Sequence, residues 1–381
     1  MSQQRIRDSL TYCYLVPMKR KILALAIILA LFILLLVKVQ SVKSISKTIL
    51  VPDDFLQIQD AINAANEGDT IFVKNGYYVE NPVINKSVSL VGEDRDTTVI
   101  DVTAGIKIEK DRVTITGFTI YDGFDGISLG ADNCNILNNK IKQATHGIVV
   151  FGNSNNITGN VFESIGLSSA IQLNYANKNI VKNNYIELCV EGIQIWQNSS
   201  NNTITENTVK NCQDTAINFQ HSNNNKLIDN EITDSGLGTS IYASNNNSIS
   251  KNNYVNNTVQ FSANEWYYLT WGGSRSVNII SENYWSDYDG TDSNGDGIGD
   301  VPYIIDENNM DQYPLMKSVA IPVFPEPTLA PQPTPTPSLE PTPTPPEGSP
   351  YSIPAFVVGS VVVIAVGLGL LVLVYFKKRK H

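Results

Sequence analysis

Apolar and polar positions alternate along the middle of the chain in a pattern that returns about every two dozen residues. Each copy has an apolar residue, about two polar residues, an asparagine, one more residue, and then an aromatic or β-branched residue. The anchoring asparagines lie 21 to 31 residues apart, at Asn139, Asn160, Asn183, Asn207, Asn230, Asn252 and Asn283. A period of this length is typical of a solenoid, in which each repeat forms one coil.

A second marker, a small residue followed by an apolar strand, runs in step with the first. It occurs at Gly126-Ile127, Gly147-Ile148, Ala170-Ile171, Gly192-Ile193, Ala216-Ile217 and Ser240-Ile241. Within a strand, inward apolar residues alternate with outward polar ones, as for Ile193 and Ile195 around Gln194. Because a single coil cannot bury its apolar face, neighbouring coils must stack. We therefore predict an all-β fold, a right-handed parallel β-helix of about eight or nine coils over residues 92–316.

Asparagine is strongly over-represented, with 30 copies between positions 131 and 260. Asparagine tolerates the left-handed backbone conformation of tight corners. Stacked at one corner, its amide can also bond to the asparagines of the coils above and below. We therefore interpret the repeated asparagines as architectural.

The two ends of the repeat region are expected to be covered. Residues 48–91 are predicted as an N-terminal cap, since Phe55, Ile58, Ile62 and Ala65 fall on one helical face. At the other end, the Asp/Gly-rich segment 284–316 is expected to close the solenoid. The interval of 31 residues before Asn283 predicts an inserted loop that projects from one coil.

Long apolar segments near both termini predict membrane attachment. Residues 22–39 suit a signal peptide or a signal anchor after a basic segment, residues 1–21, in which Met18 offers another start. A Pro/Thr-rich stalk is expected at 322–350, a transmembrane helix at 355–376 and a basic cytoplasmic tail at 377–381. The basic flanks predict a cell-membrane protein, single- or double-pass, whose repeat region is extracellular.

The segment from about 48 to 316 also resembles a known class of proteins. The resemblance lies in the cap DDFLQIQDAINAANEGDTIFVKNGYYVE, the line INKSVSLVGED, the asparagine-bearing coils and the closing ENYWSDYDGTDSNGDGIGDVPYIID. In these segments the chain resembles the NosD-like, carbohydrate-binding and sugar-hydrolysis (CASH) class of β-helix proteins. This resemblance implies a pectin-lyase-like fold built of parallel β-helix repeats. It leaves copper maturation, sugar enzymology and binding open as functions.

Charge and cysteine content narrow the candidates. A formal net charge of −10 argues against a nucleic-acid partner. Copper, which the resemblance implies, is not favoured, because the chain has only three histidines and no Met or Cys cluster. Cys189 and Cys212 are close to one period apart, so either a disulfide between neighbouring coils or two buried free thiols fits the spacing.

One loop has the spacing of a calcium site. Asp292, Asn294, Asp296 and Asp300 supply oxygen ligands at positions 1, 3, 5 and 9, with Gly297 at position 6. Tyr303 stands where an EF-hand has its bidentate glutamate, so a helix-loop-helix site is excluded. Structural Ca²⁺ and metal-free Asp/Gly turns both remain open.

Polar residues just before the small-apolar marker predict a column on one face. The column contains Asp125, His146, Ser169, Glu191 and, one residue earlier in its coil, Asp214. Carboxylates on neighbouring coils could act as acid and base on a sugar. We therefore assign Asp125, His146, Glu191 and Asp214 as candidate catalytic residues, against the alternative that outward turn positions are simply polar.

Aromatic residues that follow the coils or sit in the ejected loop favour sugar binding, since a sugar needs a stacking face beside amide groups. The candidate ligand-binding residues are Tyr175, Trp196, Phe219, Trp266, Tyr267, Tyr268 and Trp271. The sequence thus favours a cell-surface protein that binds glycans or another extracellular polymer. The alternatives are a polysaccharide lyase, hydrolase or epimerase, and a copper accessory protein.

Overall fold

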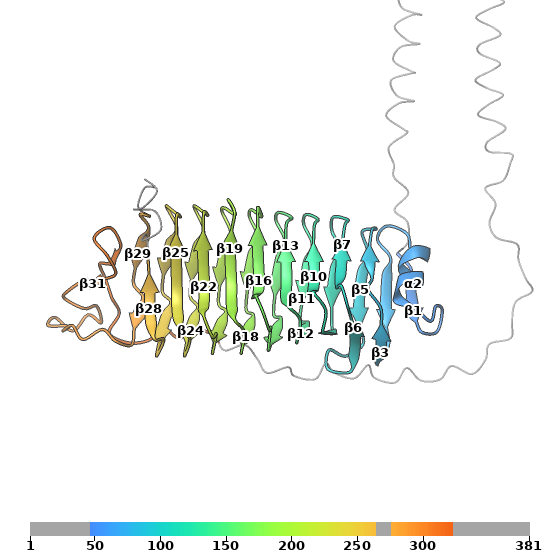
Figure 1. The fold of residues 1–381 in the computed structure, drawn as a ribbon, viewed down its shortest axis with the longest axis horizontal. Coiled ribbons are helices and arrows are strands. Elements are labelled where there is room, and N and C mark those ends of the chain that lie inside the picture. Colours follow the sequence, from blue (N-terminus) through green and yellow to red (C-terminus); the bar gives the residue numbers. More distant parts are fainter. Residues whose placement is uncertain (1–45, 264–275, 323–381) are drawn as a thin grey trace, which may run out of the picture. The chain divides into compact units, whose positions relative to one another are not determined.

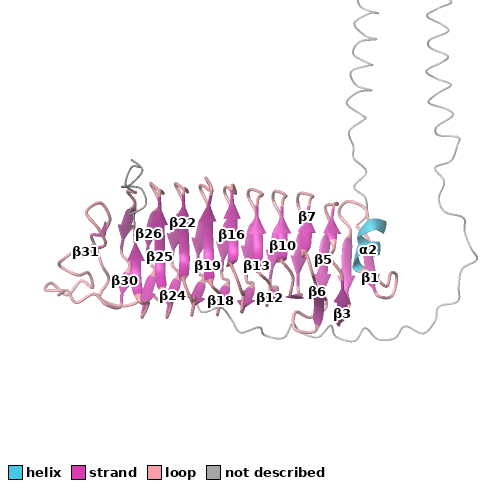
Figure 2. Cartoon of the chain, in the orientation of Figure 1, coloured by secondary structure: helices cyan, strands magenta, loops and turns pink. Residues whose placement is uncertain are grey.

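A computed structural model describes residues 46–263 and 276–322 of the chain. These residues coil into a right-handed parallel β-solenoid of about ten turns, in which each turn contributes strands to three sheets (Figure 1). Figure 2 shows that strands and tight turns make up nearly all of the solenoid. The predicted all-β parallel solenoid is confirmed.

The first sheet has thirteen strands in the described residues, and its neighbours along the axis pair in parallel until the last pair, β32 and β31, which is antiparallel. In spatial order its strands are β1 (Thr48–Val51), β2 (Thr70–Val73), β5 (Ser89–Gly92), β8 (Thr114–Thr116), β11 (Asn135–Leu137), β14 (Asn156–Thr158), β17 (Ile180–Lys182), β20 (Thr203–Thr205), β23 (Lys226–Ile228), β26 (Ser248–Ser250), β29 (Ile279–Ser281), β32 (Met310–Asp311) and β31 (Tyr303–Ile304).

The second sheet has ten strands in the same part of the chain. They are β3 (Gly76–Val79), β6 (Thr98–Asp101), β9 (Thr119–Tyr121), β12 (Lys140–Lys142), β15 (Val161–Glu163), β18 (Tyr185–Glu187), β21 (Thr208–Lys210), β24 (Glu231–Thr233), β27 (Asn253–Val255) and β30 (Tyr284–Trp285).

The third sheet has nine strands among the described residues and contains the longest ones. They are β4 (Val83–Ile84), β7 (Ile106–Ile108), β10 (Asp125–Leu129), β13 (His146–Val150), β16 (Ser169–Asn174), β19 (Glu191–Trp196), β22 (Thr215–Gln220), β25 (Leu237–Tyr242) and β28 (Val259–Ser262).

The solenoid has more coils than the eight or nine expected, because the segment 48–91 is itself part of the sheets. It contributes β1 to β4 and most of β5. The helix α2 (Ile58–Ala64) lies beside β1 at the N-terminal end (Figure 1) and buries Ile58, Ala61 and Ile62. The structure thus places much of the segment 48–91 in the strands of the solenoid. That the segment as a whole acts as an N-terminal cap stays a prediction.

Columns of like apolar residues fill the interior. Ile127, Ile148, Ile171, Ile193 and Ile217 are in register on neighbouring strands, and each is 0% exposed. Burying one such side chain contributes roughly 1.5–3 kcal/mol. Since a coil supplies only a few of these residues, the coils depend on one another for stability.

Two ladders of buried asparagines run along the solenoid on either side of the thirteen-stranded sheet. In each ladder, amide Nδ2 groups donate to the amide oxygen of the next coil, for example Asn184 to Asn207 at 3.0 Å and Asn179 to Asn202 at 3.2 Å. One ladder contains Asn139, Asn160, Asn184, Asn207, Asn230, Asn252 and Asn283; the other contains Asn155, Asn179, Asn202, Asn225, Asn247, Asn278 and Asn309. The predicted amide stacking is confirmed.

The backbone explanation for the ladder asparagines is wrong. The left-handed conformation belongs to the residue just before the ladder position, such as Asn138 (φ 49°), Asn183 (φ 52°) and Glu206 (φ 55°). Asn183, which the spacing placed in the ladder, is therefore the corner residue, and Asn184 is the ladder residue. The ladder position requires an amide that points inward, and the corner before it requires the unusual φ.

A carboxylate closes the C-terminal end of the ladder that contains Asn283. Asp311 is fully buried and accepts from the backbone N–H and the Nδ2 of Asn283, at 2.8 and 3.0 Å, and from Nε1 of Trp285 at 3.1 Å. A group that only accepts suits the last rung of a ladder whose amides donate toward that end. The Trp285 ring stacks between Tyr254 and Tyr303, at centroid distances of 4.4 and 4.3 Å.

The predicted membrane segments, 22–39 and 355–376, and the stalk at 322–350 lie outside the described residues, except for position 322. The helical structure within 46–263 and 276–322 has neither the length nor the apolar character of a membrane span. Cys134, Cys189 and Cys212 are free and buried thiols. Of the two possibilities for Cys189 and Cys212, a disulfide or two buried free thiols, the structure contains the free thiols.

Candidate functional site

The outer face of the nine-stranded sheet carries the predicted polar column. Asp125 and His146 are in register on β10 and β13, and Ser169 and Glu191 are in register on β16 and β19. In the next coil, the residue in register is Thr215, and Asp214 precedes the strand. The structure therefore aligns four members of the column and leaves Asp214 one position out of line.

Asp125 and His146 form one contact pair in this column. His146 Nδ1 lies 3.1 Å from Asp125 Oδ1 and 3.3 Å from the carbonyl oxygen of Phe124. The Phe124 ring meets the imidazole edge-on at a centroid distance of 5.1 Å. Burial raises the pKa of Asp125, and the neighbouring imidazole opposes this rise.

Glu191 forms the centre of a second group. Its Oε2 accepts from Ser169 Oγ at 3.0 Å, and its Oε1 accepts from Asn218 Nδ2 at 3.2 Å. Burial raises the pKa of the Glu191 carboxyl; the two hydrogen bonds lower it, and the charge of Asp214 raises it further. Glu191 therefore holds its proton to a higher pH than an exposed glutamate.

The four candidate catalytic residues do not converge on one point. Asp125 and Glu191 are three coils apart, which at about 4.8 Å per coil is about 14 Å. Paired carboxylates of glycosidases are about 5–9.5 Å apart. Glu191 and Asp214 lie on neighbouring coils, so they are the pair of carboxylates whose spacing along the axis suits joint action on a sugar.

The predicted aromatic residues have different positions in the structure. Tyr175 is 57% exposed, and Trp196, the last residue of β19, is half-buried. Phe219 is 0% exposed and packs in the core, so its prediction as a ligand-binding residue is wrong. It fails because Phe219 shares the inward parity of Ile195 in the preceding coil. Trp266, Tyr267, Tyr268 and Trp271 lie outside the described residues.

The structure adds a row of amides that the sequence reading did not single out. Gln172, Gln194 and Asn218 are in register on three neighbouring strands, and the Gln172 amide donates to that of Gln194. Trp196 lies two residues beyond Gln194 on the same face, in register with Asn174. The Oδ1 atoms of Asn174 and Asn218 are buried and have no hydrogen-bond partner in the protein. The alternation around Ile193 and Ile195 places Gln194 outward, and the register of the coils extends this position to Gln172 and Asn218.

The predicted calcium loop uses its side-chain oxygens within the loop. Asp292 accepts from the backbone N–H groups of Gly295, Asp296 and Gly297 at 2.7–3.2 Å. Asp300 Oδ2 accepts from the N–H and hydroxyl of Ser293 and from Thr291, and these bonds lower the Asp300 pKa. Ca²⁺ at Asp292, Asn294, Asp296 and Asp300 stays a prediction, and the hydrogen bonding resembles that of metal-free Asx turns.

Within residues 46–263 and 276–322, no group of three or more His, Cys, Asp or Glu side chains is arranged to hold a metal ion. His146 contacts a carboxylate, and His221 packs edge-on against Tyr242 at 5.4 Å. The three described thiols are buried, and burial raises their pKa, that of Cys189 to about 12. This donor set does not fit copper, which binds imidazole, thiolate or thioether.

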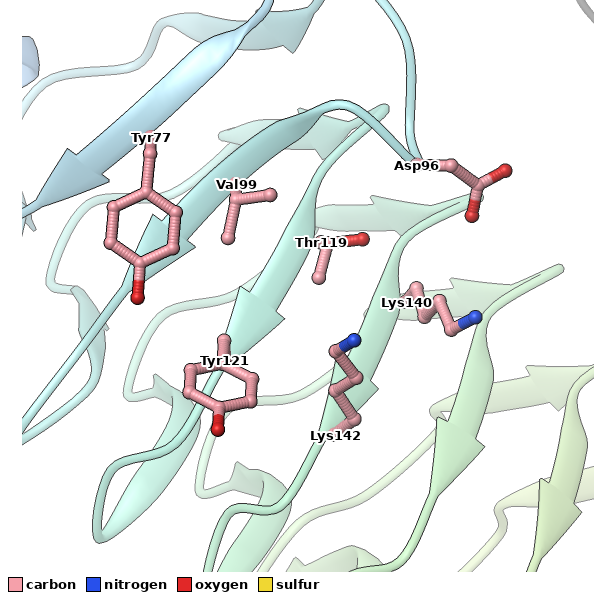
Figure 3. Close-up of a pocket in the computed structure, with 7 residues that line it drawn as sticks. All are labelled: Tyr77, Asp96, Val99, Thr119, Tyr121, Lys140 and Lys142. Carbon is pink, nitrogen blue, oxygen red and sulfur yellow. The ribbon is translucent and has the colours of Figure 1, made fainter.

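A separate hollow of about 300 Å³ lies on the outer face of the ten-stranded sheet (Figure 3). Tyr77, Asp96, Val99, Thr119, Tyr121, Lys140 and Lys142 line it. The sequence reading missed this hollow, because it depends on which side chains of four neighbouring coils come into register.

Solved structures similar to the chain include enzymes that act on alginate. A mannuronic-acid-specific polysaccharide family 6 lyase from human gut microbiota is 12% identical, with a TM-score of 0.45 over 64% of this chain and 66% of that one. A PL6 alginate lyase in complex with a trisaccharide is 13% identical, with a TM-score of 0.48 over 66% and 62%. The periplasmic alginate epimerase AlgG is 13% identical, with a TM-score of 0.30 over 64% and 73%. These likenesses carry no information on activity.

One sequence relative and one family model are more informative. A cell surface glycoprotein of Methanothermus fervidus is 34% identical over 97 residues, which cover 24% of this chain and 16% of that protein. The chain thus matches a small part of that relative's length. The family model described as periplasmic copper-binding protein (NosD) matches residues 62–290, which contain most of the solenoid. The chain therefore belongs to the NosD family.

Proposed function

We propose that this protein binds a glycan along the outer face of the nine-stranded sheet. The row of Gln172, Gln194 and Asn218 with Trp196 beside it carries the proposal. The half-buried Trp196 ring offers a sugar a stacking surface, and amides supply both donors and acceptors for hydroxyl groups. The row extends over three neighbouring coils, so it suits a segment of a polymer that lies along the solenoid axis.

The same proposal places the solenoid outside the cytoplasm. The family description names a periplasmic protein, and the glycoprotein relative is a cell surface protein. The apolar segments at 22–39 and 355–376, with basic residues beside them, suit attachment to the cell membrane with a cytoplasmic tail. The Pro/Thr-rich stretch at 322–350 would hold the solenoid away from the bilayer.

A panel of neutral and acidic polysaccharides, immobilised and probed with the purified chain, tests the proposal. Trp196→Ala is expected to weaken binding at least about tenfold, or about 1.4 kcal/mol. Tyr313→Ala is the matched control. Tyr313 has a ring that is 54% exposed, and it lies after β32 of the thirteen-stranded sheet, away from the proposed site. Equal binding by wild type and Trp196→Ala, or no binding to any polysaccharide, would refute the proposal.

Glu191 supports a second candidate function, a polysaccharide lyase, hydrolase or epimerase. Its raised pKa suits a group that donates a proton, and Asp214, which precedes the strand of the neighbouring coil, is a carboxylate whose charge contributes to that rise. Incubation of each bound polysaccharide with the chain distinguishes the two functions. New reducing or unsaturated ends that Glu191→Gln abolishes would indicate an enzyme, and binding without turnover a binding protein.

A further inference from the structure

The hollow on the ten-stranded sheet results from a row of unequal side chains. Tyr77, Val99, Thr119 and Lys140 are in register on β3, β6, β9 and β12. Two short side chains therefore lie between two long ones along the solenoid axis. Figure 3 shows Val99 and Thr119 in the middle, with the tyrosine rings toward one side, Lys140 and Asp96 toward the other, and Lys142 between Tyr121 and Lys140. At about 300 Å³ the hollow reaches the lower limit for ligand pockets, about 300–1,000 Å³.

The neighbouring row supplies a ring and a cation. Tyr121 and Lys142 are in register on β9 and β12, and Lys142 Nζ lies 5.6 Å from the centroid of the Tyr121 ring. Tyr77 is 61% exposed, so its ring is available to a ligand. Figure 3 shows the Lys142 ammonium beside Thr119 rather than pointing away from the hollow.

The carboxylates around the hollow already have partners. Glu163 lies 3.1 Å from Lys140 Nζ, and Asp96 lies 4.0 Å from Arg95 Nε. Asp101 accepts from the Tyr77 hydroxyl. Lys142 is in register with Glu163 but, among the described residues, has no carboxylate within ion-pair distance.

A second lysine on this sheet shows what a fully paired arrangement looks like. Lys210 lies 5.0 Å from the centroid of the Tyr185 ring, as Lys142 lies over Tyr121, but its Nζ is also 3.2 Å from Glu187. The Tyr185 hydroxyl donates to the same carboxylate at 2.8 Å. The protein thus supplies a carboxylate to Lys210, with which Glu187 is in register, and supplies none to Lys142 among the described residues.

We propose that the hollow binds a carboxylate-bearing unit of an acidic saccharide, with its carboxylate on Lys142 and its ring against Tyr77. An ammonium that is free of protein carboxylates favours an anion in an otherwise acidic chain. The tyrosine rings provide a stacking surface, and their hydroxyls and Asp96 can bond to sugar hydroxyls. This site lies on a different sheet from the amide row, so it goes beyond the function proposed above.

Titration calorimetry of the full chain at low ionic strength tests the site with two probes, trigalacturonate and trigalactose, which differ in their carboxylates. Wild type is expected to bind trigalacturonate at least about tenfold more tightly than trigalactose, as one charge-assisted hydrogen bond allows. Lys142→Gln is expected to abolish this difference. Lys210→Gln, the matched control, and Trp196→Ala are both expected to retain it.

Three results would overturn the inference. These are equal binding of both probes by wild type, unchanged trigalacturonate binding by Lys142→Gln, and equal weakening by Lys142→Gln and Lys210→Gln, which would indicate general attraction of charge. If Trp196→Ala loses trigalacturonate and Lys142→Gln retains it, the acidic saccharide binds on the nine-stranded sheet. In that case the hollow is not its site, while the proposed glycan-binding function stands.

Discussion

Replacement of one ladder asparagine by alanine is expected to destabilise the solenoid. Asn207 is fully buried, and its Nδ2 donates to Val181 O, Thr205 O and Asn230 Oδ1 at 2.9–3.0 Å. Its Oδ1 accepts from the backbone N–H and the Nδ2 of Asn184 at 2.9 and 3.0 Å. One side chain thus joins three consecutive coils.

The magnitude follows from the groups that Asn207→Ala leaves without this partner. Asn184 Nδ2 keeps Ile157 O at 2.8 Å, and Asn230 Oδ1 keeps the backbone N–H of residue 207 at 3.0 Å. The Asn184 N–H loses its acceptor, whereas the Val181 carbonyl stays in the ladder between the paired strands β17 and β20. At about 1–3 kcal/mol for one buried group without a partner, the loss is about 1–3 kcal/mol.

Urea unfolding followed by circular dichroism measures this loss, and Thr203→Ala is the matched control. Thr203 is on β20 of the same coil, faces outward and is half-buried, so its replacement is expected to cost less than about 1 kcal/mol. If the free energies of unfolding of the two variants differ by less than about 0.5 kcal/mol, the ladder does not stabilise the solenoid as argued.

Three further predictions concern buried groups. The melting temperature of Glu191→Gln is expected to rise relative to that of wild type as the pH is raised above 4.5, the ordinary pKa of a glutamate carboxyl, because a carboxyl with a raised pKa stabilises the fold below its unfolded pKa and loses that contribution as pH rises through its folded pKa. A difference in melting temperature that does not change with pH would contradict this. Iodoacetamide is expected to leave Cys134, Cys189 and Cys212 unmodified in the native chain at about pH 8 and to modify them after denaturation, as mass spectrometry would show, since burial raises their pKa; rapid native modification would indicate exposed thiols. Phe219→Ala is expected to cost about 3–5 kcal/mol in urea unfolding, and a cost below about 1 kcal/mol would mean that the ring is not in the core.

The period of the sequence was sufficient to predict the solenoid, because coils of nearly equal length must place like residues in columns. It was insufficient to decide between adjacent positions within a coil. Asn183 and Asn184 fit the spacing equally well, and only backbone geometry shows that the first turns the corner and the second points inward. For Asp214, by contrast, the prediction that it lies one residue before the column position agrees with the structure, since β22 begins at Thr215.

The candidate sites were less predictable than the coils, for two different reasons. Phe219 could have been placed correctly, since the inward parity of Ile193 and Ile195 applies to Ile217 and Phe219 in the next coil. The hollow beside Lys142 could not, because it requires the register of β3, β6, β9 and β12. Whether Glu163 pairs with Lys140 or Lys142 also depends on side-chain geometry that no spacing rule contains.

Hydrogen-bond accounting separates the structural asparagines of this chain from the candidate functional ones, although both occur in in-register columns. The donors and the acceptor of Asn207 are all bonded within the protein, so a ligand has nothing to add there. Asn218 is nearly as buried, yet its Oδ1 has no partner, and its Nδ2 is bonded to a carboxylate whose pKa is raised. A buried acceptor without a partner costs free energy that a purely structural column has no reason to carry. Among the described residues, the buried side-chain polar atoms without a hydrogen-bond partner are Arg95 Nε, Asn174 Oδ1 and Asn218 Oδ1, and the two asparagines belong to the nine-stranded sheet. These two acceptors support the proposal that a ligand binds on the outer face of that sheet.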